Sequence, residues 1–207
     1  MTEETPTPAR LEAFSDGVIA VIITVMVLDL KVPHADGLTA LRALAPGVAN
    51  YLLSFAFCGI YWLNHQHLMH RVQRAGHTMQ CANLLFLFCL SLLPFSTAYV
   101  IEKEMSGSAV SLYAATLLIV ALSFMLLRLT VHSRLRHQNA FSEEDRKGFR
   151  NHVLSLFLYA IGVVAGIFFP KTVLWLIAIL TFVWALPNLS LRRIKGKWPA
   201  HQREELP

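Results

Sequence analysis

Polar side chains at the head of an apolar stretch are the first candidates for chemistry in this sequence. Arg10, Ser15 and Asp16 lead directly into an apolar run that ends at Leu30, and a single hydroxyl, Thr24, lies deep within that run. Ionisable groups in or at the edge of a bilayer are costly, so they mark a working site with a partner nearby. The stretch therefore predicts a membrane helix that lines a path, rather than a simple anchor.

On a helix, the same stretch presents two different faces, because successive residues turn by about 100°. The first face is a narrow stripe of small, branched or hydroxyl-bearing side chains: Gly17, Val21, Thr24, Leu28 and, beside them, Val25. Ser15 lies nearly opposite this stripe, and Asp16 lies about a quarter-turn from it. One face is therefore smooth with a single hydroxyl, and the other carries the polar pair.

The spacing alone leaves two interpretations of this stripe open. If copies of the helix surround a common axis, Val21 and Leu28 form apolar rings with a ring of Thr24 hydroxyls between them. Such a constriction can gate by dewetting, and the hydroxyl ring can replace part of an ion's hydration shell. In the other interpretation, Thr24 bonds to its own helix and the stripe is ordinary packing.

The composition of the 207-residue chain indicates a membrane protein. Hydrophobic residues make up 55% of the chain and charged residues only 15%, whereas soluble domains carry about a quarter charged residues. The acidic N-terminus lacks the pattern of a secretory signal peptide. We therefore expect one all-α membrane domain that occupies residues 1–207.

Six apolar stretches each approach the ~20 residues that cross a bilayer core. They cover about residues 12–30, 46–66, 78–100, 108–131, 150–169 and 172–191, and a basic cytoplasmic tail follows at 192–207. The longest polar loop is expected at residues 132–150. Pro94 predicts a kink in the third span. Pro170 and Lys171 leave so short a turn that the last two spans must be antiparallel neighbours.

The distribution of basic residues predicts the orientation of these spans. Of the 18 Lys and Arg residues, a six-span arrangement puts 14 on the side of the N-terminus and 4 on the other side. By the positive-inside rule, both termini are then cytoplasmic, and the protein is a multi-pass protein of the inner (plasma) membrane. The basic ends are expected to contact anionic lipid headgroups. No nucleic-acid-binding motif accompanies the net charge of +5.

The spans differ in polarity, and the difference predicts their positions. The fourth and sixth spans are almost entirely aliphatic and aromatic, so we expect them to form a shell that faces lipid. The first three spans carry polar groups and should form the functional core. The chain has no internal repeat, so a single pore-type helix needs copies from other subunits to enclose a path. The expected assembly is a symmetric homo-oligomer.

The second and third spans supply candidate partners for the polar head of the first. Trp62, Asn64 and His65 lie near the cytoplasmic end of the second span, at the depth of Asp16, and Asn83 lies at a similar depth in the third. Trp62 also suits the aromatic belt at the membrane interface. We expect His65 or one of the asparagines to pair with Asp16, so that the acid is held in a satisfied cluster.

Histidines and cysteines do not form a recognisable metal site in the sequence. His65, His67 and His70 are spaced so that adjacent members lie on different helical faces, and H-E-x-x-H is absent. The three cysteines lie in apolar runs without C-x-x-C spacing. We expect no cofactor and no resident metal. A histidine that senses pH remains an alternative to a structural one, because histidine titrates near neutrality.

Several motifs occur together in the first hundred residues. R-x-x-x-F-S-D and G-V-x-A precede Thr24 in the first span, Y-W-x-x-H lies in the second, and Asn83 and P-F-S-T lie in the third. This combination resembles the lysosomal potassium channel family, transmembrane protein 175, in its prokaryotic form. The resemblance implies a six-span subunit that assembles as a homotetramer and conducts K⁺ through a pore lined by the first helix, without a T-V-G-Y-G filter.

Carried over residue by residue, the resemblance assigns roles to both faces of the first helix. It implies the tightest apolar ring at Val21, a hydroxyl layer at Thr24, an outer apolar layer at Leu28 and a further apolar position at Val25, with permeant K⁺ near Val21 and Thr24. It also implies a polar network that anchors the helix, formed by Arg10, Phe14, Ser15, Asp16, Trp62, His65 and Asn83. The family often has isoleucine or leucine where this chain has Val21, which predicts a looser ring and weaker selectivity for K⁺ over Na⁺.

The expected function is a potassium-permeable cation channel with a hydrophobic constriction, whose partners are other copies of the chain, membrane lipid and permeant cations. The alternative is a proton-coupled secondary transporter in which Asp16 and a histidine carry protons. Transporters usually show internal repeats or broken helices near the midplane, and neither is clear here. A membrane enzyme or scaffold is a third class, but the sequence contains no catalytic constellation.

Overall fold

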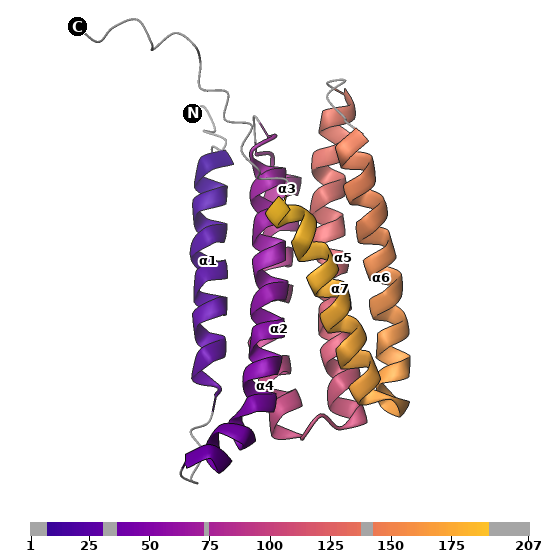
Figure 1. Cartoon of the computed structure of the whole chain (residues 1–207). Helices are drawn as coiled ribbons and strands as arrows, with labels where there is room; N and C mark the ends of the chain where they lie inside the picture. The colour runs from indigo at the N-terminus through magenta and orange to yellow at the C-terminus, as the bar shows by residue number, and fades with distance from the viewer. Residues whose placement is uncertain (1–7, 31–36, 73–74, 138–142, 191–207) are drawn as a thin grey trace, which may run out of the picture.

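The computed structural model describes residues 8–30, 37–72, 75–137 and 143–190, and these residues form helices without any strand. The seven helices are α1 (Pro8–Leu28), α2 (Gly37–Met69), α3 (His77–Leu90), α4 (Leu93–Glu102), α5 (Gly107–His137), α6 (Glu143–Phe168) and α7 (Pro170–Ser190). They run along one common direction as an elongated bundle (Figure 1). The expectation of an all-α membrane protein is confirmed at this level.

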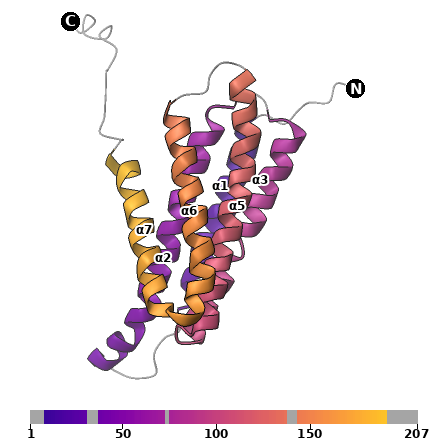
Figure 2. The same cartoon turned by 90° about the vertical axis from the view of Figure 1, so that its right-hand side faces the viewer.

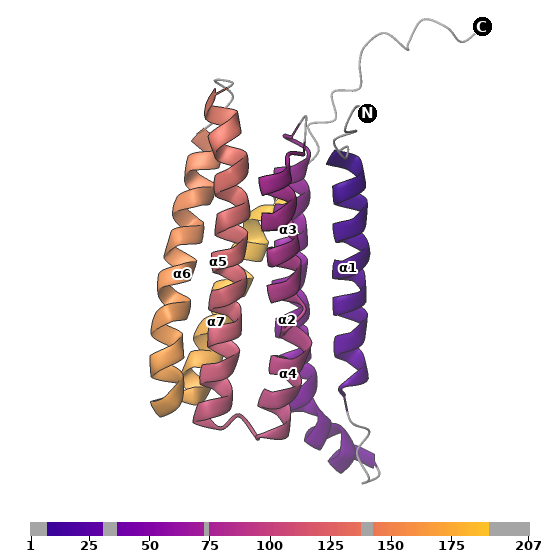
Figure 3. The same ribbon diagram turned by 180° about the vertical axis from the view of Figure 1, so that it is seen from behind.

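The helices are arranged so that α1 forms one edge of the bundle. It packs against α2, α3 and α4, whereas α6 lies at the opposite edge and packs closely against α5, which is next to it on the inner side (Figure 3). The helix α7 crosses the bundle obliquely and contacts both α2 and α6 (Figure 2). The side of α1 that faces away from the bundle therefore has no covering helix in the described part of the chain.

Five helical segments are long and apolar enough to cross a membrane: Pro8–Leu28, Gly37–Met69, His77–Glu102, Gly107–Ser133 and Asp145–Phe168. A sixth apolar segment, Pro170–Trp184, is shorter. The expected spans correspond to these elements, but the helices extend further than predicted at the polar end. Most of the loop expected at 132–150 is helical, because α5 continues to His137 and α6 begins at Glu143. The tail at 192–207 lies outside the described residues.

The third expected span is divided into two helices. The helix α3 ends at Leu90 and α4 begins at Leu93, with Pro94 in the first turn of α4. Proline is tolerated at this position because the first amides of a helix have no intrahelical partner. The predicted kink at Pro94 is therefore a short break just before it. The helix α2 also contains a proline, Pro46, and its first turns bend away from the bundle (Figure 1).

The prediction that the fourth span faces lipid is wrong. The helix α5 lies at the centre of the protomer, and many of its side chains, such as Tyr113, Leu117 and Phe124, are fully buried. It packs against α3, α4, α6 and α7. Apolar composition did not distinguish a central from a peripheral helix, because lipid tails are as apolar as the protein interior.

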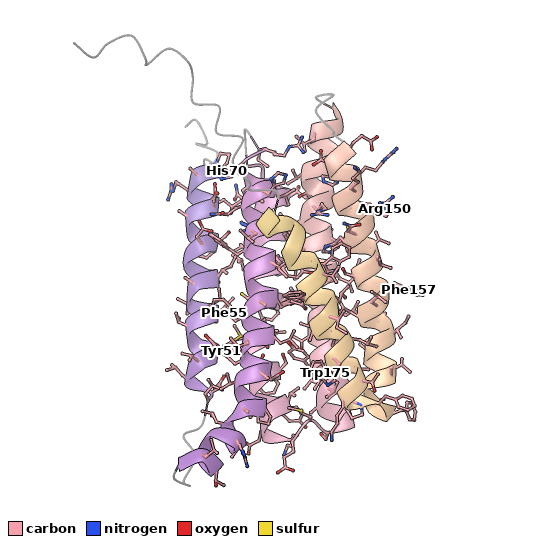
Figure 4. The ribbon with its side chains drawn as sticks, in the orientation of Figure 1. Tyr51, Phe55, His70, Arg150, Phe157 and Trp175 are labelled. Atoms are coloured by element: carbon pink, nitrogen blue, oxygen red, sulfur yellow. The ribbon has the colours of Figure 1, made fainter. Side chains whose placement is uncertain are left out.

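The outer surface of the protomer is formed to a large extent by α6 and α7. Large exposed apolar side chains cover both helices, among them Phe157 and Ile161 on α6 and Trp175 and Phe182 on α7. Figure 4 shows Phe157 pointing away from the bundle. This surface has the character that a lipid-facing shell requires, so for α7 the sequence-based expectation agrees with the structure.

Glycines allow α5 and α6 to approach closely. A Cβ atom on Gly166 would lie 3.1 Å from the backbone nitrogen of Ser111, and one on Gly107 would overlap the carbonyl oxygen of Ile167. The Ser111 hydroxyl donates a hydrogen bond of 2.6 Å to the carbonyl oxygen of Val163. Small residues at such contacts are typical of membrane helix pairs. The G-x-x-x-G motif that ends at Gly166 is therefore a packing motif.

Substitution of Gly107 should separate α5 from α6. We expect Gly107→Ala to lower the free energy of unfolding by about 1–3 kcal/mol, because the new methyl group must displace backbone atoms. The matched control is Gly59→Ala, whose methyl group would meet no atom within 4 Å, and which should stabilise α2 by about 0.5–1 kcal/mol. Thermal unfolding in detergent measures both. Equal midpoints for the two variants would contradict the close contact.

Candidate functional site

The helix α1 has a buried face and an exposed face on opposite sides. The buried face consists of Ser15, Ile19, Ile22 and Met26. The exposed face includes the stripe identified in the sequence: Gly17, Val21, Thr24, Val25 and Leu28. The exposed fractions are 59% for Val21, 41% for Val25 and 79% for Leu28. All five residues of the stripe thus point away from the rest of their own protomer.

A chain of hydrogen bonds joins α1 to α3 and α2. The Ser15 hydroxyl donates to the carbonyl oxygen of Leu11 at 2.8 Å, and it accepts from the Asn83 amide nitrogen at 2.9 Å. The Asn83 side-chain oxygen lies 2.7 Å from Nε2 of His65. Since a side-chain carbonyl can only accept, Nε2 of His65 is the donor. Ser15, Asn83 and His65 are fully buried, so each relies on the others for its hydrogen bonds.

A second contact holds Asp16. The indole nitrogen of Trp62 donates to a carboxylate oxygen of Asp16 at 2.8 Å. This differs from the expectation that His65 or an asparagine would pair with Asp16: His65 bonds to Asn83, and Asn64 donates to the carbonyl oxygen of Ile60 in its own helix. The physical reason is the position of Asp16, which lies about a quarter-turn from the buried face of α1. There it meets Trp62, which precedes His65 by about one turn of α2.

Arg10 and Phe14 do not join this cluster in the described part of the chain. Both are exposed, because their positions on the helix fall on the same side as Val21. A contact that was not predicted from the sequence involves the residue midway between them: a carboxylate oxygen of Glu12 lies 3.5 Å from Nε2 of His70, a pair that is ionic only when the histidine is protonated. Figure 4 shows His70 at the end of the bundle where α1 begins.

The hydroxyl of Thr24 donates to the carbonyl oxygen of Val21 at 3.0 Å. The bond to its own helix, left open in the sequence analysis, is therefore present. It does not exclude a role on the exposed face, because the only proton of the hydroxyl is directed to the helix and the oxygen keeps lone pairs for another donor or a cation. Thr24 can thus offer an acceptor, but no proton, to whatever lies outside this face.

A second buried polar cluster joins α2, α4 and α5 towards the other end of the bundle. The Ser54 hydroxyl lies 2.8 Å from the Thr97 hydroxyl and 3.0 Å from the Tyr113 hydroxyl. The Asn50 amide nitrogen donates to the carbonyl oxygen of Thr97 at 3.0 Å. The sequence analysis did not identify this cluster, although isolated polar residues inside apolar spans were the available signal. It fixes α4 to its neighbours just after the helix break.

Histidines in the described residues do not gather into a metal site. His65 is buried, whereas His67 is exposed on another face of α2 and His70 is exposed just after the helix ends. The described part of the chain contains no group of three or more His, Cys, Asp or Glu side chains that could hold a metal ion. The polar groups around α1 are instead arranged in hydrogen-bonded pairs, an arrangement that holds helices together.

Comparison with known proteins identifies the family. Residues 10–94, which cover most of α1, all of α2 and α3 and the polar cluster between them, match the sequence model described as endosomal/lysosomal potassium channel TMEM175. A protein from Chryseobacterium sp. (strain P1-3) named as a potassium channel is 33% identical over 187 residues, which cover 90% of this chain and 97% of that protein. A potassium channel of Streptomyces collinus is 40% identical over 126 residues, covering 57% and 61% of the two chains.

A solved structure has the same fold. The crystal structure of a lysosomal potassium-selective channel TMEM175 homolog from Chamaesiphon minutus matches with a TM-score of 0.77 and 27% identity, over 87% of this chain and 97% of that chain. The chain belongs to the TMEM175 family, which confirms the resemblance seen in the motifs. The members of this family are ion channels and not enzymes, which removes the membrane-enzyme alternative.

Loss of Asn83 should weaken the attachment of α1. Asn83→Ala leaves Ser15 and His65 buried without their shared partner, and we expect a loss of stability of about 1–3 kcal/mol. The control Asn64→Ala removes an amide that bonds only within α2 and should change stability by much less. Thermal unfolding and gel filtration in detergent compare the two. If both variants unfold like the wild type, the hydrogen-bond chain does not hold α1.

Proposed function

We propose that this protein is a potassium-permeable cation channel in which α1 from several copies of the chain, four by the family resemblance, lines a central pore. The observation that carries the proposal is the outward orientation of the stripe on α1, together with the polar cluster that attaches the opposite face to the protomer. An edge helix held in this way presents the same surface in every subunit, as a closed symmetric assembly requires.

The chemistry of the stripe supports a path for cations. Val21 and Leu28 would form apolar rings, and such rings can gate a pore by dewetting. Thr24 lies between them and can offer only its oxygen lone pairs, since its proton is directed to Val21. A ring of such oxygens attracts cations and gives anions no donor. The permeant K⁺ ion would therefore be stabilised near Val21 and Thr24.

The basic residues support an orientation with both termini in the cytoplasm. Among the described residues, Arg71 near the end of α2, Arg146 and Lys147 at the start of α6 and Arg10 in α1 lie at one end of the bundle. Lys103 and Lys171 lie at the other end. By the positive-inside rule, the first end faces the cytoplasm. The membrane is then the inner (plasma) membrane of the cell. This orientation requires α7 to cross the bilayer as the sixth span.

The transporter alternative needs Asp16 to exchange protons with a histidine. In the structure Asp16 is bonded to Trp62, and His65 is bonded to Asn83. These contacts favour an anchoring role for Asp16. Human, mouse and zebrafish relatives are named proton channels, and the human protein is 34% identical over 99 residues that cover a fifth of its length. The test of function should therefore also measure whether protons permeate.

Single-channel recording in a planar bilayer tests the proposal. Purified protein with K⁺ on one side of the bilayer and Na⁺ on the other should show unitary current steps. The reversal potential should differ from zero in the direction expected when K⁺ permeates more readily than Na⁺. A pH gradient imposed without a K⁺ gradient should leave the reversal potential near zero if K⁺ carries the current. Flux that is strictly coupled to protons and shows no unitary steps would exclude a channel.

Val21 should set the width of the constriction. We expect Val21→Ile, which adds one methylene group, to shift the reversal potential further towards K⁺ and to lower the unitary conductance. Val18→Ile is the matched control, because Val18 lies on a more buried part of α1. Identical reversal potentials for wild type and Val21→Ile would remove Val21 from the selective part of the pore.

Two substitutions of Asp16 distinguish an anchoring role for this residue from binding of the permeant ion. Asp16→Asn keeps an oxygen that can accept from Trp62 but removes the charge, whereas Asp16→Ala removes both. If Asp16 anchors α1, Asp16→Asn should keep the oligomer and the conductance, and Asp16→Ala should destabilise the oligomer by about 1–3 kcal/mol. If Asp16 instead binds the permeant ion, Asp16→Asn already changes conduction while assembly survives. Gel filtration and recording on both variants give the answer.

A further inference from the structure

Arg128 on α5 is a half-buried cation whose inner nitrogen atoms have no hydrogen-bond partner. Its Nε and Nη1 atoms are buried and have no hydrogen-bond partner. Its guanidinium group lies over the ring of Phe124, 5.5 Å from the ring centroid. On the α6 side it faces Gly148, where a Cβ atom would lie 3.5 Å from Nη1. The side chain as a whole is half-buried, so part of it remains accessible.

This arrangement is costly for a protomer on its own. An arginine cannot lose its proton in a protein, so burial does not neutralise it. Buried donors and charges without partners cost free energy, and native proteins normally satisfy them. The nearest acid, Asp145 on α6, forms an ion pair with Arg71 of α2. The other titratable neighbour on α6, His152, is bonded to the carbonyl oxygen of Ala121 and carries no negative charge.

The depth of Arg128 identifies the region of the bilayer that it meets. It lies roughly 21 residues after the start of α5, or about 32 Å along the helix. This length equals the ~30 Å thickness of the hydrocarbon core. Gly148 lies five residues after the start of α6, at the same end of the bundle. With Gly107 at the opposite boundary of the hydrocarbon core, the guanidinium group lies at the level of the lipid phosphates on the side where α1 begins.

Basic side chains predominate on the exposed surface at the start of α6, where Glu143 is also exposed and is paired with Arg146. Arg146, Lys147 and Arg150 are exposed on the first turns of α6. Figure 4 shows Arg150 pointing away from the bundle, so it contributes long-range attraction and not a contact with Arg128. The N-terminal end of α6 adds the positive end of a helix dipole. An anion with several acceptor oxygens fits these surroundings.

We propose that Arg128 binds the phosphate group of an anionic phospholipid, between α5 and α6 beside Gly148. A phosphate oxygen accepts from the accessible part of the guanidinium group in a charge-assisted hydrogen bond, and the guanidinium group itself packs over Gly148, which has no side chain to displace it. The lipid adds negative charge to a site where Asp145, the acid that acts on Arg128, is already paired with Arg71. The proposal concerns binding only, and it does not depend on conduction through the α1 pore.

The test compares wild type with Arg128→Met and Arg146→Met in vesicles of phosphatidylglycerol or phosphatidylcholine. Phosphatidylglycerol should raise the unfolding temperature of the wild type above its value in phosphatidylcholine by about 5 °C. The increase should vanish in Arg128→Met and persist in Arg146→Met, which removes an exposed charge paired only with Glu143 in its own helix. Native mass spectrometry should detect one retained lipid per subunit in the wild type and none in Arg128→Met.

Arg128→Met is expected to fold, because replacing an unpaired buried charge by an apolar side chain of similar volume is often stabilising. Should it fail, Gly148→Leu keeps the charge but displaces the guanidinium group from its position over residue 148, and it should lose the retained lipid as well. An unchanged lipid-dependent shift in either variant would overturn the proposal. An increase in unfolding temperature that inorganic phosphate produces in phosphatidylcholine vesicles would assign the site to a soluble anion. That result would overturn the proposal that a lipid binds there.

Discussion

The attachment of α1 through buried hydrogen bonds is the constraint on which the proposed pore depends. In a bilayer, apolar contacts between helices have little preference over contacts with lipid, so packing alone fixes the rotation of a helix weakly. Ser15, bonded to Asn83, and Asp16, bonded to Trp62, permit only one rotation of α1. That rotation directs Val21 and Thr24 away from the protomer. The polar cluster therefore determines which apolar surface each subunit presents.

The two faces of α1 could be predicted from the sequence, and the partner of Asp16 could not. The helical period alone relates Ser15 to the face opposite Val21, and the structure has the same division. Whether Asp16 meets Trp62 or His65 depends on how far α1 slides along α2, since those two residues lie one turn apart. The spacing of residues within α1 or within α2 does not determine the position of one helix along the other. The expectation of a homo-oligomer came from a single pore-type helix without an internal repeat, whereas the number of four subunits came only from the family resemblance.

The place of α5 and the polar cluster around Ser54 show a second limit of sequence reasoning. Apolar composition is the same for a central helix and for one that faces lipid, so the burial of Tyr113 and Phe124 required three-dimensional contacts. Ser54 meets Thr97 and Tyr113, which are 43 and 59 residues away along the chain. Each of these looks like an isolated polar residue in an apolar span. Only the fold brings them together.

The polar contacts of α1 are all at one end. In the described residues, the hydrogen bonds and ion pairs that join it to other helices come from Glu12, Ser15 and Asp16. Beyond these, only apolar side chains such as Ile22 and Met26 hold it to its neighbours. A tilt about the fixed end breaks no directional bond, and it displaces Leu28 more than Gly17. The half of α1 that ends at Leu28 is thus the part whose distance from the proposed pore axis changes at the lowest energetic cost.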